Sequence, residues 1–432
     1  MFFHRVSKKF AVCIGLGFSL SNNSLTLGED WPTFRGPNRT AVVNDSKLLK
    51  SWPAEGPKLL WEGSGAGRGY SSLAIVGNKM YTLGDGLSTQ KDADEYLSCF
   101  DKATGKQLWA TKTGKPWKNG KADWQSSRST PTVDDGSVYI VTPEGQLLCC
   151  NTAEGKVIWK KYFEKDFDGK KADDWGYSES VLVDGNKVIC TPGGATSTVV
   201  ALDKKTGETL WTCKSPDDRG AGHASIVISK VGNQKVYVQS TGSGLIGFSD
   251  SGKLLWNYRI DKATAVIPTP IVRDDLVFYS VGYKRGGALV KQVPTADGGV
   301  AFKEVYGLNT KLANKHGGVV LIGDHVYGDS DDAGRPYCAD LMTGDIKWVA
   351  PARASGKGSA VVIGGGDRLY VRHENGDMAL VEANPAEYKE VGSFKIPGSG
   401  DGARPSWSHP VILEGKLYIR EQDKILCYDI RG

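Results

Sequence analysis

Short stretches in which apolar and polar residues alternate recur along most of the chain, separated by Gly, Asn, Asp or Pro. Residues 71–83 and 177–190 are two examples, each with a turn signal in its middle. A period of two places successive side chains on opposite faces of a strand. The pattern therefore predicts an all-β protein built from many short antiparallel strands.

A second pattern is an internal repeat that ends in tryptophan. Segments close to Asp-x-x-Thr-Gly-x-x-Leu-Trp lie within residues 99–109, 149–159, 201–211, 248–256 and 338–348. The Asp or Asn side chain can bond the turn backbone, and Gly supplies a left-handed residue, so each copy predicts a β-hairpin. We expect the recurring tryptophans to pack between neighbouring units: Trp61, Trp109, Trp159, Trp211, Trp256 and Trp348.

The repeat predicts how the strands are assembled. Each hairpin follows another pair of strands, and residues 267–305 and 358–394 keep the same rhythm without the hairpin signature. A four-stranded unit has two apolar faces and cannot bury both alone, so the units must pack face to face around an axis. The sequence therefore predicts an eight-bladed β-propeller of four-stranded antiparallel blades.

Closure of the ring is predicted from the two ends of the repeat region. The last unit has three strands, within residues 408–429, and its missing fourth strand matches residues 57–61, which end in tryptophan. We expect the last blade to be closed by this N-terminal strand, because closure removes free sheet edges. Residues 57–432 are then one propeller domain, and residues 29–56 form a lead-in segment.

The first 28 residues have the pattern of an export signal. Basic residues precede an apolar run at residues 10–20, which is too short to cross a bilayer, and small residues follow near Gly28. Residues 1–28 are predicted to be a cleaved signal peptide, the alternative being an uncleaved anchor. Val12 stands where a lipoprotein signal ending at Cys13 needs a small residue. We expect a periplasmic or secreted protein without a stable membrane anchor.

Charge argues against one class of partner. The chain has 54 Lys and Arg against 49 Asp and Glu, and three of the basic residues lie in the first ten positions. The remainder is close to balance and has no basic stripe of the kind that nucleic acid requires. We therefore expect no nucleic-acid partner.

The repeated hairpin resembles the PQQ-like (pyrroloquinoline quinone) repeat, and the resemblance runs from about Trp31 to the end of the chain. This repeat occurs in quinoprotein alcohol dehydrogenases and in non-enzymatic outer-membrane assembly factors of the BamB type. Residues 30–39 also resemble the start of planctomycete-type secreted propellers, some of which are called polyvinyl alcohol dehydrogenases.

The resemblance implies a cofactor only for the enzymatic members, which hold PQQ and Ca²⁺ on the axis with an Asp base and Glu and Asn ligands. No position here matches those residues one by one, and the Cys-x-x-Cys-His motif of a fused haem domain is absent. We assign no catalytic residue and no certain cofactor; PQQ and Ca²⁺ are the set that the resemblance would supply.

The adjacent pair Cys149 and Cys150 allows two interpretations. Methanol-type quinoproteins close a disulfide between adjacent cysteines over the cofactor, which is what the resemblance would imply. The repeat favours a core role, because Cys99, Cys149, Cys338 and Cys427 all stand two residues before the turn Asp or Asn. That position takes a small buried side chain, and free Cys serves there.

Three histidines precede the first strands of their blades: His223, His316 and His409. In a propeller these connections gather at one mouth of the axial channel. The imidazoles could share a metal ion, belong to a ligand-binding mouth, or form hydrogen bonds at the start of each strand. They come from alternate blades, so we predict no metal site.

Other polar and aromatic residues reach the same level of the ring: Trp124, Arg128, Trp175, Tyr177, Glu179 and Trp407. Aromatic side chains with a few convergent charges predict a small-molecule or sugar site. The alternative is that the tryptophans fill loops. The acidic loop at residues 329–334 resembles a calcium-loop fragment but lacks the later Glu, so we expect a solvated turn.

Two functional hypotheses follow. The first is an exported non-catalytic propeller that binds a protein or polysaccharide partner at the channel mouth. The second is a PQQ- and Ca²⁺-dependent alcohol dehydrogenase, in which the quinone accepts a hydride equivalent. The absence of a transferable cofactor residue favours the first.

Overall fold

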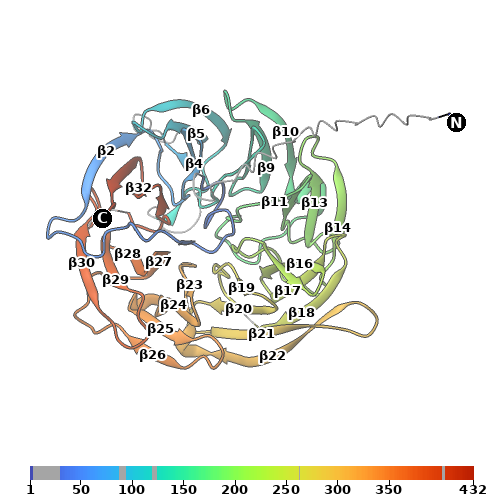
Figure 1. The fold of residues 1–432 in the computed structure, drawn as a ribbon. Helices are drawn as coiled ribbons and strands as arrows, with labels where there is room; N and C mark the ends of the chain where they lie inside the picture. The colour runs from blue at the N-terminus through green and yellow to red at the C-terminus, as the bar shows by residue number, and fades with distance from the viewer. Residues whose placement is uncertain (3–29, 87–93, 119–123, 262, 401–403) are drawn as a thin grey trace.

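The computed structural model describes residues 1–2, 30–86, 94–118, 124–261, 263–400 and 404–432. Eight antiparallel sheets stand as blades around a central axis and form a closed ring (Figure 1). The predicted all-β, eight-bladed propeller is thus confirmed. The predicted signal peptide, residues 1–28, lies outside the described residues except for its first two.

Each of the first seven blades is built in chain order from the axis to the rim. The first four blades contain β3 (Ala74–Val76), β4 (Lys79–Asp85), β5 (Glu95–Asp101) and β6 (Gln107–Gly114); β7 (Thr132–Asp134), β8 (Ser137–Val141), β9 (Gln146–Asn151) and β10 (Val157–Tyr162); β11 (Leu182–Asp184), β12 (Lys187–Cys190), β13 (Val199–Asp203) and β14 (Thr209–Cys213); β15 (Val227–Val231), β16 (Gln234–Thr241), β17 (Gly244–Ser249) and β18 (Leu254–Arg259).

The second half of the ring continues the arrangement, and the two units that lack the hairpin signature are regular blades. These blades contain β19 (Ile271–Arg273), β20 (Leu276–Val281), β21 (Gly286–Pro294) and β22 (Val300–Asn309); β23 (Val320–Ile322), β24 (His325–Asp329), β25 (Pro336–Asp340) and β26 (Ile346–Val349); β27 (Ala360–Gly365), β28 (Arg368–His373), β29 (Asp377–Glu382) and β30 (Glu390–Lys395); β31 (Val411–Leu413), β32 (Lys416–Glu421) and β33 (Lys424–Asp429).

The eighth blade takes its outermost strand from the other end of the chain. Strand β2 (Lys58–Ser64) pairs antiparallel with β33, and Trp61 lies opposite Cys427, as predicted. The ribbon in Figure 1 shows β2 at the rim outside β32. Because β2 and β33 come from opposite ends of the repeat region, their pairing closes the ring.

The hairpin between the third and fourth strands has the turn chemistry that the repeat predicted. The carboxylate of Asp101 accepts hydrogen bonds from the backbone of Ala103 at 3.1 Å and of Thr104 at 2.9 Å. Gly105 follows with a φ of +71°, and a Cβ there would lie 2.5 Å from Cζ3 of Trp61 in the preceding blade. The glycine is therefore needed both for its backbone conformation and for the tryptophan that covers it.

The core is distributed between blades rather than gathered at one place. One apolar cluster joins Tyr81 and Cys99 of the first blade to Val138 and Leu148 of the second, and similar clusters follow around the ring. The recurring tryptophan of one blade covers the turn glycine of the next, as Trp109 covers Gly155 and Trp159 covers Gly207. This arrangement confirms that the tryptophans of the repeat pack between blades.

The axis is crossed by residues 31–41, which we call the channel segment. It starts at Trp31, which pairs with Ile75 of β3 in the first blade, and ends where β1 (Val42–Val43) pairs parallel with β27 in the seventh blade. The blue ribbon passes through the centre of Figure 1 along this path. The lead-in segment is therefore part of the interior of the ring.

Two buried arginines of the channel segment hold it in place. Arg39 Nη1 donates to the carbonyls of Ser180 at 2.8 Å and of Ile226 at 3.1 Å, and Arg35 Nη1 donates to the carbonyl of Gly317 at 2.9 Å. Burial lowers the pKa of each guanidinium to about 10, so both stay charged at neutral pH. One short segment is thereby bonded to blades three, four and six.

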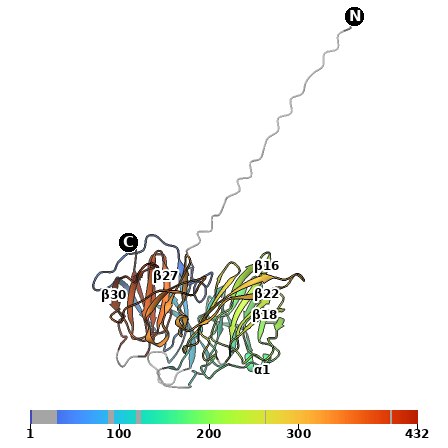
Figure 2. The ribbon, with the colours of Figure 1, turned by 90° about the horizontal axis from the view of Figure 1, so that it is seen from below.

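The two faces of the ring differ. The helix α1 (Phe163–Phe167) and the C-terminus lie on opposite faces in the side view of Figure 2. The face with α1 carries the connections between blades, including the short 3₁₀ turn η2 (Thr310–Leu312), and the loops between second and third strands, including the 3₁₀ turn η3 (Asp331–Ala333). Within the described ranges no helix has the length and apolar character needed to span a bilayer.

Candidate functional site

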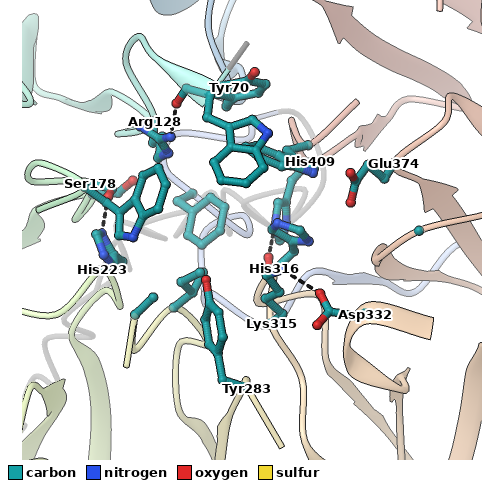
Figure 3. Close-up of a pocket in the computed structure, with 18 residues that line it drawn as sticks. Tyr70, Arg128, Ser178, His223, Tyr283, Lys315, His316, Asp332, Glu374 and His409 are labelled. Carbon is teal, nitrogen blue, oxygen red and sulfur yellow. Dashed lines mark hydrogen bonds and ion pairs between the residues drawn. The ribbon is translucent and has the colours of Figure 1, made fainter. Parts of the chain in front are cut away.

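A cavity of about 460 Å³ opens on the face that carries the connections between blades. We call it the mouth cavity. Figure 3 shows its lining, which comes from many blades and from the channel segment. The lining residues are Phe34, Tyr70, Trp124, Arg128, Trp175, Ser178, Ser180, His223, Ala265, Ile267, Tyr283, Lys315, His316, Asp332, Gly358, Glu374, Trp407 and His409.

One wall of the mouth cavity is a continuous row of aromatic rings. Trp175 lies 5.5 Å from Trp124, which lies 6.3 Å from Trp407, measured between ring centroids. Trp407 in turn stacks on His316 at 4.8 Å with an interplanar angle of 30°. Phe34, from the channel segment, meets His409 edge-on at 4.7 Å. The aromatic wall thus comes from the connections before blades two, three, six and eight and from the channel segment.

Arg128 lies among these rings. Its guanidinium is 5.2 Å from the ring centroid of Trp117 and 5.5 Å from that of Tyr70, which are cation–π distances. It donates hydrogen bonds to the backbone carbonyls of Ser126, at 3.1 Å, and of Trp124. Burial lowers its pKa to about 10, so it keeps its charge at neutral pH. Its contacts hold the loop that presents Trp124.

His223 belongs to a local hydrogen-bond chain. Its Nε2 donates to the carboxylate of Asp173 at 3.0 Å, and the hydroxyl of Ser178 donates to its Nδ1 at 2.5 Å. Burial acts to raise the pKa of Asp173, but the hydrogen bonds that it accepts from His223 and from the backbone of Trp175 hold that pKa below its usual value. Both ring nitrogens of His223 are therefore occupied by neighbours.

His316 and His409 form a neutral pair. Nε2 of His409 donates to the carbonyl of His316 at 3.1 Å. Burial lowers the pKa of both imidazoles to about 3; the charge of Lys315 adds to this at His316, and that of Arg35 does so at His409. These two residues are uncharged hydrogen-bonding groups across the physiological range.

The opposite wall of the mouth cavity is polar. Lys315 donates to Asp332 at 2.5 Å, and its ammonium lies 5.0 Å from the ring centroid of Tyr283. Glu374 lies on the right in Figure 3, and its carboxylate meets no donor among the described residues. Charge on this wall is thus mostly paired, with Glu374 as the exception.

The acidic loop before β25 is not the solvated turn that the sequence predicted. Asp329 is fully buried and accepts from the backbone of Ala360 at 3.0 Å, and burial raises its pKa well above the usual value. Asp331 is also buried and accepts from the backbone of Lys284 at 2.8 Å. This prediction was wrong because it treated the loop in isolation, whereas neighbouring blades cover it.

The mouth cavity contains most of the predicted binding residues but not all. Arg128, His223, His316, Trp407 and His409 line it, together with Trp124 and Trp175. Tyr177 and Glu179 do not. Tyr177 donates its hydroxyl to the carbonyl of Pro192, and Glu179 accepts from the backbone of Thr191 at 2.7 Å.

Alternation of side chains along the extended segment before β11 explains why Tyr177 and Glu179 do not line the cavity. Ser178 and Ser180 face the mouth cavity, so Tyr177 and Glu179, which alternate with them, point the other way into the blade. Four further lining residues were not predicted from the sequence: Phe34, Tyr283, Lys315 and Glu374. No repeat marks those four positions, and only the folded ring brings them together.

The cysteines and carboxylates do not fit the cofactor set of the enzymatic members. Cys149 and Cys150 are free thiols, buried in two different clusters. Ca²⁺ needs six or more oxygen ligands. Asp173, Asp332 and Glu374 come from different blades, and among the described residues no three His, Cys, Asp or Glu side chains gather as metal ligands.

The chain matches two classes of known protein. A family model described as outer membrane protein assembly factor BamB matches residues 93–350. A BamB of Xanthomonas campestris pv. campestris is 26% identical over 35% of this chain and 36% of its own length. The dehydrogenase subunit of the quinone-dependent alcohol dehydrogenase of Gluconobacter oxydans is 29% identical over 35% of this chain and 22% of its own length.

The chain therefore spans about a third or less of these two relatives. The solved structure of the quinohemoprotein alcohol dehydrogenase of Comamonas testosteroni superposes with a TM-score of 0.62 over 94% of this chain and 81% of its own, at 14% identity. At that identity the likeness concerns the fold alone.

Proposed function

Since this chain belongs to the propeller family of the outer membrane protein assembly factor BamB, we propose that it is an exported, non-catalytic binding propeller that holds a protein or polysaccharide partner at the mouth cavity. The family model covers well over half of the chain, and the relatives named BamB support a binding role. Export is supported by the signal-peptide pattern of residues 1–28.

This proposal rests on one observation: aromatic rings line the mouth cavity, whereas most of its groups that could transfer a proton are bonded to neighbouring residues. Trp124, Trp175 and Trp407 line the cavity with ring surface. The groups able to transfer a proton are mostly engaged: His223 is bonded at both nitrogens, and Asp332 is paired with Lys315. Such a lining favours holding a ligand over transforming it.

Titration of the purified protein with PQQ and Ca²⁺ tests the proposal against the dehydrogenase alternative. Tryptophan fluorescence follows binding, and dye reduction with short alcohols follows turnover. We expect no alcohol-dependent dye reduction, because in the part of the chain that the structure describes the carboxylates around the axis do not gather as calcium ligands. Saturable binding of PQQ with turnover would overturn the proposal and identify a quinoprotein.

Export is tested separately by N-terminal sequencing of the protein recovered from the periplasm or medium. We expect the mature chain to begin close to residue 29. A mature N-terminus upstream of residue 20, or recovery only from the cytoplasm, would contradict export without bearing on the mouth cavity.

A further inference from the structure

The mouth cavity has the size and lining of a site for one ring-shaped group. Its volume of about 460 Å³ lies within the range of small-ligand pockets, about 300–1,000 Å³. Trp124 and Trp407 lie next to each other on one wall, so a flat group that enters meets aromatic faces. Phe34, which belongs to the channel segment, also lines the cavity. The ligand must therefore have at least one apolar face.

The charges around the cavity argue against an ionic ligand. Lys315 is paired with Asp332, and Arg128 donates to backbone carbonyls. An anion would be attracted by Arg128 but repelled by the carboxylate of Glu374, and a cation would meet the reverse, so the lining favours neither sign of charge. An uncharged ligand avoids both costs.

The cavity also argues against a purely apolar ligand. His316, Tyr283 and Glu374 have side-chain polar groups for which the described residues offer no hydrogen-bond partner. An apolar group against them would leave a carboxylate and a hydroxyl desolvated and unpaired. Hydroxyl groups both donate and accept, so they satisfy the carboxylate and the neutral imidazole alike.

These observations select one class of ligand. We propose that the mouth cavity binds an uncharged sugar ring of a saccharide, which stacks its C–H face on Trp407 and Trp124 and hydrogen-bonds through its hydroxyls to Glu374 and His316. This inference rests on the proposed binding function and specifies what is bound. The ring faces supply an apolar contact, and the polar edge orients the hydroxyls.

Isothermal titration calorimetry of the full exported protein tests this assignment. The probes are neutral oligosaccharides built from glucose, galactose, mannose or N-acetylglucosamine, together with oligogalacturonate and an unrelated soluble peptide. We expect at least one neutral oligosaccharide to bind saturably and oligogalacturonate to bind at least about tenfold more weakly. Binding should also shift the tryptophan fluorescence of the protein, because the rings lie at the contact.

Two substitutions locate the contact. Trp407→Ala removes a stacking face and should weaken binding at least about tenfold, whereas Glu374→Gln keeps the shape and should weaken it about fivefold. Tyr162→Ala is the matched control, since Tyr162 is an exposed aromatic on the outer strand β10, and it should leave affinity unchanged. Glu374→Gln also serves if Trp407→Ala fails to fold.

The outcomes separate the two proposals. Failure of every neutral oligosaccharide to bind, or binding that survives both cavity substitutions in folded protein, overturns the sugar assignment. If the peptide binds instead and Trp407→Ala abolishes that binding, the cavity is a protein-binding site and the binding function stands. Alcohol turnover with PQQ and Ca²⁺ would overturn the binding function itself.

Discussion

The rim and the axis of this propeller are stabilised in different ways. At the rim, Trp159 covers Gly207 of the next blade, and the same contact recurs between other neighbours, each joining two blades. At the axis, Arg39 alone bonds blades three and four, and Arg35 reaches blade six, 282 residues away in the chain. The rim is thus a sum of nearest-neighbour contacts, whereas the axis couples several blades through one segment.

This difference predicts how far the structural effect of a single substitution should extend around the ring. Loss of a rim contact loosens one interface and leaves the other interfaces intact. Loss of an axial contact leaves buried carbonyls of several blades without a donor. Four changes, in decreasing order of expected effect, test that contrast.

Deletion of residues 57–63 should have the largest effect, because it removes most of β2 and opens the ring between the first and eighth blades. We expect the free energy of unfolding to fall by at least about 5 kcal/mol, more than loss of a short edge strand elsewhere would cost. Urea unfolding followed by circular dichroism measures it. An unchanged midpoint would mean that the ring does not depend on this closure.

Arg39→Ala should come next, at about 3–5 kcal/mol, since it leaves the carbonyls of Ser180 and Ile226 buried and unpaired. Hydrogen exchange should show faster opening in blades three and four together. Arg431→Ala is the control, because Arg431 is exposed and should change nothing measurable. Equal effects of the two substitutions would contradict the coupling at the axis.

Trp159→Leu should cost about 1–3 kcal/mol, because the ring loses its contact with Gly207 and its hydrogen bond to the carbonyl of Lys204 at 3.1 Å. Faster exchange should stay confined to blades two and three. Ile158→Ala, at a neighbouring exposed side chain, should have no effect. Loss of protection around the whole ring would show that the rim is as cooperative as the axis.

Glu179→Gln should cause the smallest loss of folding stability of the four changes. Its effect should be visible only as a change in how that stability depends on pH. Burial raises the pKa of Glu179 to about 8 from its ordinary 4.5. The folded protein therefore holds the carboxyl proton more tightly than the unfolded chain does. The contribution of this proton to the free energy of unfolding is complete below pH 4.5 and is lost as the pH rises through 8. Melting temperatures measured from pH 5 to 9 should fall less steeply in the variant. Parallel curves would mean that Glu179 is ionised in the folded protein.

The same contrast explains what could be predicted from the sequence. Strand alternation, the Thr-Gly turn and the recurring tryptophan are local and repeated, so they determine the blades, their number and the closure by residues 57–61. The channel segment carries no repeat, and Arg35 meets Gly317 only after the ring has formed. Burial of Asp329 escaped prediction for the same reason.

The candidate site was predicted in part because some of its residues occupy equivalent places in different blades. His223, His316 and His409 precede first strands, and all three reach the mouth cavity. Tyr177 and Glu179 were chosen on the wrong side of an extended segment, since position along the chain alone does not say which neighbour faces the axis. Glu374 and Tyr283 lie on loops between second and third strands, where no pattern marks them.

The channel segment also imposes an order in time. Its partners at Gly317 and Val319, and the strand β27 beside β1, are synthesised about 280 or more residues after Arg35. Until then Arg35 has only its local acceptors, the carbonyls of Arg39 and Thr40, and β2 has no strand to pair with before β33 is made. Strand β2 is synthesised before the other strands of the blades but is among the last to pair. A chain that is interrupted before β33 leaves β2 without a partner strand. Closure of the ring therefore has to wait until β33 has been synthesised.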